Sequence, residues 1–237
     1  MAHEPADTTF QQLSQKLIKE HWDFYPTAGS RIGRHEYDGR LPDLSPSQNA
    51  RRESELRRGL TELHALDTGG LDEAGRMSYR VMELFLRREL FIFNDLKPLE
   101  NNPMRLTGYL NMSGYIRRDY APLEDRLRSA AAAMRQVPDF LDVLDRAISD
   151  TLSSHVVDMS VESYAGMARF YRVDLAGAAK GVIDPEIVGE FDLAREAAAV
   201  ALDRFIEALK SCGKGGPEGF AIGPELYSGM LATGEGL

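Results

Sequence analysis

The sequence is poor in the residues that build disulfides and metal centres. Cys212 is the only cysteine, which excludes an intramolecular disulfide and any zinc site made of cysteine pairs. The five histidines include no pair spaced i, i+4, the spacing at which two imidazoles point to one side of a helix. No HExxH motif occurs. We therefore expect no metal ligand, no cofactor and no zinc-dependent activity in this chain by itself.

Surplus positive charge and long apolar runs are also missing. The net charge is −9, and none of the arginine pairs, such as Arg117-Arg118, extends into a longer basic stretch, so these pairs are interpreted as solvated helix faces. Because phosphate contacts need a basic surface, a nucleic-acid partner is not expected. The first residues lack the features of a secretory leader, and no apolar run approaches the length that spans a bilayer. The sequence predicts a cytoplasmic protein without membrane association.

No segment shows sustained strand-like alternation, whereas apolar residues recur at helical spacing along most of the chain. Helix-start signals support this pattern, notably Ser45-Pro46 and Asp184-Pro185. The clearest predicted helices cover residues 9–24, 72–96, 122–137, 161–180 and 185–212. The helix over 72–96 carries apolar residues on two faces and is expected to be buried on more than one side. We predict an all-α fold, an antiparallel array of about eight helices without significant sheet, over a single domain 1–237.

Residues 22–45 form the one long segment that neither helical nor strand-like periodicity explains. It combines three glycines and two prolines with six apolar anchors, too many for a solvated tail. We predict an ordered loop that holds a set of polar and aromatic side chains as substrate-cleft candidates. They are Arg31, Arg34, His35, Tyr37, Asp38 and Arg40. The alternative interpretation is a connection between helices whose polar groups satisfy its own backbone.

This same segment carries a family resemblance. Its pattern resembles the N-terminal signature of the bacterial domain-of-unknown-function family numbered 885, and two later stretches agree with it. The matching residues are Trp22, Pro26, Gly33, His35, Tyr37, Asp38, Arg40, Leu41, Asp43 and Ser45, then 120–122, Arg126, Arg135 and 137–141, and finally 220–225. The resemblance extends over almost the whole chain.

The resemblance implies a largely helical zinc metallopeptidase of the HExxH type whose metal motif lies in a second half of similar size. This chain resembles the first half, so zinc is implied only for the part that is missing here. The sequence leaves two functions open. In one, the chain contributes scaffold and cleft wall to a metallopeptidase-like hydrolase, with its partner half or a second copy bound to apolar faces at 77–96 and 220–231. In the other, it is a stand-alone helical binding or scaffold protein without catalytic activity.

Overall fold

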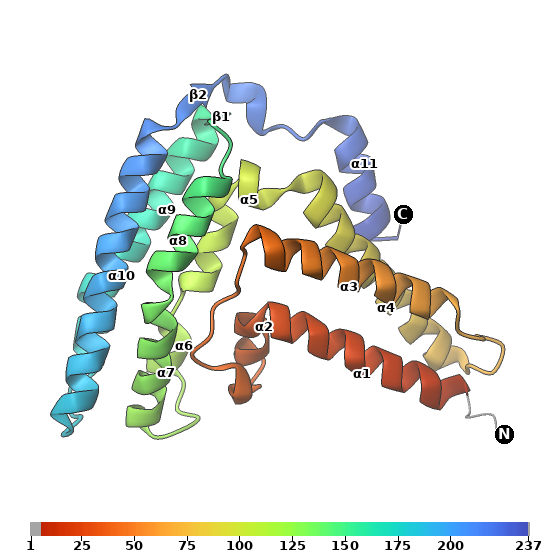
Figure 1. The fold of residues 1–237 in the computed structure, drawn as a ribbon, viewed down its shortest axis with the longest axis horizontal. Helices are drawn as coiled ribbons and strands as arrows, with labels where there is room; N and C mark the ends of the chain where they lie inside the picture. The colour runs from red at the N-terminus through yellow and green to blue at the C-terminus, as the bar shows by residue number, and fades with distance from the viewer. Residues whose placement is uncertain (1–5, 237) are drawn as a thin grey trace. The chain divides into compact units, whose positions relative to one another are not determined.

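The computed structural model describes residues 6–236, and helix dominates it (Figure 1). Eight α-helices of seven or more residues occur in the described range, which confirms the predicted all-α array of about eight helices. The only strands found there, β1 (Thr151–Ser153) and β2 (Gly213–Gly215), pair in parallel over three residues each. The chain divides into two compact units.

Unit 1 comprises the described parts of Met1–Phe24, Ser45–Lys97 and Ala221–Leu237. Its helices are α1 (Ala6–Phe24), α3 (Pro46–His64), α4 (Glu73–Phe91), the π-helical turn η2 (Ile92–Leu96) and α11 (Gly223–Gly234). The Asp72 side chain accepts a hydrogen bond from the Gly75 amide at 2.7 Å and so caps α4.

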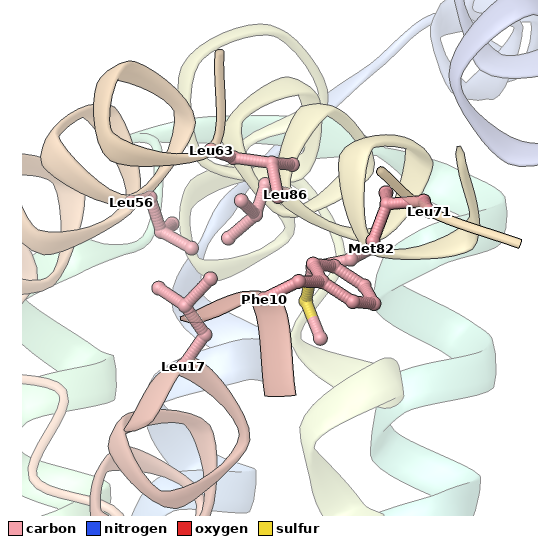
Figure 2. Packing of buried hydrophobic residues seen from close by; sticks show 7 residues of the cluster. All are labelled: Phe10, Leu17, Leu56, Leu63, Leu71, Met82 and Leu86. Carbon is pink, nitrogen blue, oxygen red and sulfur yellow. The ribbon is translucent and has the colours of Figure 1, made fainter. Parts of the chain in front are cut away.

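Leucines, a phenylalanine and a methionine from α1, α3, α4 and the turn before α4 form the core of unit 1. Figure 2 shows Leu17 of α1 pointing toward Leu56 of α3, with Leu86 of α4 beside them. Leu56, Leu63 and Leu86 have exposed fractions of 0–1%. Each such burial contributes about 1.5–3 kcal/mol, so the shared core explains why segments distant in sequence form one unit.

Unit 2 comprises Tyr25–Leu44 and Pro98–Phe220. It begins with the short helices α2 (Pro26–Arg31) and η1 (His35–Tyr37). Its later elements are α5 (Pro98–Asn101), η3 (Pro103–Leu110), α6 (Ser113–Arg117), α7 (Leu123–Arg135), α8 (Val137–Ala147), α9 (Ser154–Val173), η4 (Leu175–Gly177), α10 (Pro185–Ser211) and η5 (Pro217–Phe220).

The longest helix, α10, packs along α7, α8 and α9 in unit 2 (Figure 1). Asp184 caps its first turn by accepting from the Glu186 amide at 2.9 Å, as the Asp-Pro signal predicts. Its inward face alternates large side chains such as Phe191 with alanines such as Ala198, both fully buried. Small side chains such as Ala198 let a neighbouring helix approach closely. Ala130 on the facing helix α7 is also fully buried and allows the same close approach.

Two buried tyrosines fasten η3 to α9 and thereby position the chain that follows η3. The Tyr164 hydroxyl donates to the Pro103 carbonyl and the Tyr171 hydroxyl to the Leu110 carbonyl, both at 2.9 Å. A buried main-chain oxygen needs a donor, so each bond satisfies a group that would otherwise be unpaired. Burial raises the pKa of both phenols, which keeps them protonated and able to donate.

Three sequence expectations about these elements are wrong in part. Residues 22–45 are not one loop: α1 ends at Phe24, as the predicted helix over 9–24 does, but the short helices α2 and η1 then interrupt the segment. The helix predicted over 161–180 is α9 at 154–173, since Ser153 rather than a later residue takes the N-cap position. The 72–96 helix is buried through Met82 and Leu86, but on its other predicted face Met77 and Val81 are 63% and 58% exposed.

Candidate functional site

The site is built on the segment between α1 and α3, and close packing holds this segment against the rest of unit 2. A β-carbon on Gly29 would lie 2.7 Å from the ring of buried Tyr37, so only glycine lets α2 pack on this ring. Gly39 has a φ of 75°, a left-handed conformation that glycine adopts without strain. Its amide donates to the Tyr115 hydroxyl at 2.9 Å, and its carbonyl accepts from the Gln136 side chain at 2.7 Å.

Asp38 is the centre of a hydrogen-bond network under this segment. Its carboxylate accepts from the Ser30 hydroxyl, from the Tyr120 hydroxyl at 2.7 Å and from His35 Nδ1 at 3.0 Å. The Asp38 side chain is only 8% exposed, so these three donors replace most of its hydration. Since a carboxylate can only accept, the network selects the His35 tautomer that carries a proton on Nδ1.

The two aromatic partners of Asp38 also contact each other. The His35 and Tyr120 rings are stacked, with centroids 3.8 Å apart and planes 6° from parallel. Burial and the adjacent Asp38 carboxylate raise the pKa of Tyr120, and the same two causes raise the pKa of Tyr115. Both phenols are therefore neutral at physiological pH, so the Tyr120 hydroxyl donates to Asp38 while the Tyr115 hydroxyl accepts from the Gly39 amide.

Arg126 of α7 fixes the stretch 115–121, which forms the opposite side of the site. Its guanidinium donates to three main-chain carbonyls, those of Tyr115 at 3.0 Å, Arg118 at 2.8 Å and Ala121 at 2.8 Å. It also donates to Asp119 at 3.1 Å. A buried arginine with this many fixed acceptors converts an irregular stretch of chain into a rigid one.

These two segments bound a cavity of about 280 Å³ within unit 2. Its lining contains four arginines, one histidine and no aspartate or glutamate, in a chain whose net charge is −9. Hydroxyl and amide groups, among them those of Ser30, Asn111, Ser113 and Tyr120, add neutral polar groups to the lining. We call this cavity the arginine pocket; its arginines are Arg31, Arg40, Arg117 and Arg118.

The structure brings together half of the site residues predicted from the sequence. Arg31, His35 and Arg40 line the arginine pocket. Asp38 lies beneath it and holds His35. The other two are elsewhere in the same segment, where Tyr37 is buried and Arg34 pairs with Glu36 at 3.0 Å.

Sequence reasoning missed the far wall of the pocket. It is made by residues of η3, α6 and the following turn, among them Tyr109, Asn111, Ser113, Arg117, Arg118 and Tyr120. The Arg117-Arg118 pair was interpreted as a solvated helix face, and both side chains are indeed exposed. The only feature of the sequence that pointed to this wall was Tyr120, which is part of the family resemblance.

Comparison with known proteins decides the family. The family described as "Bacterial protein of unknown function (DUF885)" matches residues 26–236. The chain belongs to this family. The DUF885 match includes both walls of the arginine pocket. No curated protein matches the sequence.

A solved structure shares the fold of this DUF885 chain. It is titled "The structure of a putative lipoprotein of unknown function from Shewanella oneidensis", with a TM-score of 0.82 and 22% sequence identity. The similarity covers 94% of this chain and 42% of the other, so the present chain spans less than half of that relative's length.

Within residues 6–236, no three histidine, cysteine, aspartate or glutamate side chains are grouped so that they could hold a metal ion. These residues therefore do not fit a zinc centre, which the family resemblance implies only for a second half. Over the same range, no helix is both long enough and apolar enough to cross a membrane.

Proposed function

We propose that this chain is the helical, substrate-binding portion of a metallopeptidase-like protein and contributes scaffold and cleft wall but not the metal site. Membership of the DUF885 family and the sequence resemblance support this proposal. A relative of the same fold and more than twice the length gives room for a second half that would hold the metal. The chain's own residues then bind and orient the substrate, which is a large part of what an enzyme must do.

The observation that carries the proposal is the arginine pocket. It is a preformed concave site, and the Asp38 network and Arg126 make its walls rigid. Preformed pockets with a few convergent polar groups are the usual binding sites of enzymes. The pocket also lies in the segments that carry the family resemblance, through His35, Arg40 and Tyr120.

A second candidate is a stand-alone helical binding protein, which the surface of unit 1 favours. Large apolar side chains are exposed on α4, at Met77 and Val81, and on α11, where Tyr227 is 52% and Met230 37% exposed. Exposed apolar groups of this kind are typical of protein contacts. Under either function, they are where we propose that a C-terminal half or a second copy of the chain binds.

The two candidates differ in whether the chain binds peptides. The test incubates the chelator-washed, zinc-reloaded chain with a peptide library, and follows binding by fluorescence anisotropy, cleavage by mass spectrometry and retained zinc by metal analysis. We expect peptides to bind without being cleaved and zinc to wash off. Tightly retained zinc with cleavage would contradict the absence of a metal site, and a chain that binds no peptide would favour the stand-alone function. Light scattering on the same sample reports self-association.

A further inference from the structure

Three arginines of the pocket, Arg31, Arg117 and Arg118, have no acidic partner among the described residues. Arg31 donates to the Gly108 carbonyl, and Arg118 donates to the Arg31 carbonyl at 2.9 Å. Both acceptors are neutral main-chain oxygens, which orient the guanidinium groups but leave their charges uncompensated. Over the described residues, the Arg117 side chain has no hydrogen bond or ion pair.

The Asp38 carboxylate beneath the pocket does not change this balance. The Asp38 carboxylate is already engaged by Ser30, His35 and Tyr120 and is almost buried. It does not line the pocket, and neither does any other aspartate or glutamate. Within residues 6–236, the charges of Arg31, Arg117 and Arg118 are thus held around one cavity without a counter-ion, an arrangement that favours an anionic ligand.

The size of the pocket and its hydrogen-bond donors narrow the class of anionic ligand further. Guanidinium groups form paired, charge-assisted hydrogen bonds with planar carboxylates. The hydroxyls of Ser113 and Tyr120 and the amide of Asn111 add neutral polar groups to the same lining. A volume of about 280 Å³ accommodates one residue of a peptide rather than an extended segment.

We propose that the arginine pocket binds a carboxylate group of a peptide, with Arg117 and Arg118 as its main anion ligands. The peptide part of this inference rests on the proposed function, whereas the carboxylate part rests on the uncompensated arginines. The carboxylate comes from the C-terminus of the peptide or from an aspartate or glutamate side chain, and the chemistry of recognition is the same in both cases.

Three fluorescent peptides of one neutral sequence test the proposal by anisotropy with the intact chain. One has a free C-terminal carboxylate, one is C-terminally amidated, and one is amidated but carries an internal glutamate. We expect the amidated neutral peptide to bind at least about tenfold more weakly than a carboxylate-bearing one, since a hydrogen bond to a charged group contributes about one tenfold factor or more. Raising the salt concentration should narrow the difference, because the arginines are exposed.

Single substitutions assign the effect to the pocket. Arg117→Gln removes one charge from a side chain without partners, so the fold should be unaffected and carboxylate peptides should bind about tenfold more weakly. Arg169→Gln is the matched control. It removes the same charge from an exposed arginine of α9 that is outside the pocket lining, and should leave binding unchanged.

The outcomes separate this inference from the function on which it rests. If only the free-terminus peptide binds more tightly than the amidated neutral peptide, the result supports a C-terminal carboxylate. If the internal-glutamate peptide binds as tightly as the free-terminus peptide, and both bind more tightly than the amidated neutral peptide, the result supports a side-chain carboxylate. Equal binding of all three peptides, or equal losses in Arg117→Gln and Arg169→Gln, overturns the inference but leaves peptide binding in place. Failure of every peptide to bind overturns the proposed function itself.

Discussion

Arg126 offers the sharpest test of how the pocket is held together. We expect Arg126→Met to destabilise unit 2, because methionine keeps much of the apolar stem but donates no hydrogen bond. Of the three carbonyls that Arg126 satisfies, the one on Tyr115 is buried and those on Arg118 and Ala121 are partly buried.

The size of the effect follows from that difference in burial. Leaving one fully buried acceptor unpaired costs about 2 kcal/mol, and each partly buried one about 0.5–1 kcal/mol because water reaches it. The ion pair with Asp119 adds little, since the Asp119 side chain is 95% exposed. The expected loss in the free energy of unfolding is about 3–4 kcal/mol.

Urea denaturation followed by far-UV circular dichroism measures this loss. Arg128→Met on the same helix is the control. Its ion pair with Asp125 joins two side chains that are both more than half exposed, so the loss should stay below about 0.5 kcal/mol. A loss below about 1 kcal/mol in Arg126→Met would refute the argument that this guanidinium fixes residues 115–121.

The same titration tests the expectation of a single domain. Trp22 is the only tryptophan and belongs to unit 1, so its fluorescence reports on that unit alone. If the chain unfolds as one domain, the Arg126→Met substitution in unit 2 shifts the fluorescence and dichroism transitions together. A shift confined to dichroism would contradict the single-domain expectation.

Three further substitutions probe the site and the pH response. Asp38→Ala should lower stability by about 2–3 kcal/mol in urea titrations, because it leaves three donors without their acceptor; an unchanged midpoint would contradict this. Gly29→Ala should cost about 1–3 kcal/mol by forcing a methyl group against the Tyr37 ring, seen as a lower melting temperature. The pKa of Glu83 is lowered mainly by its hydrogen bond with His64, so it stabilises the fold above about pH 4.5 and this contribution is lost as the pH falls. As the pH falls below that value, the free energy of unfolding of Glu83→Gln should therefore decrease less than that of the unsubstituted protein. Equal decreases in the two proteins would count against the pairing.

Local signals in the sequence determined most of the helices. Asp184-Pro185 and Ser45-Pro46 mark the starts of α10 and α3 because capping and proline geometry depend only on neighbouring residues. Where such signals are weak, prediction failed, as at α9, whose first turns follow directly from β1. The pairing of β1 with β2 joins residues about sixty positions apart, and three-residue strands leave no pattern in the sequence.

The candidate site was only half visible in the sequence for the same reason. Arg31, His35 and Arg40 could be named because they cluster in one unusual segment. Arg117 and Arg118 looked like any solvated arginine pair, since nothing nearby in sequence shows which carbonyls, rings or charges surround them. Only the tertiary structure places them opposite that segment, because hydrogen bonds such as Arg118 to Arg31 and Tyr120 to Asp38 join residues more than eighty positions apart. Short-range propensity thus determined the helices of this protein, and long-range packing decided which of its charges share a pocket.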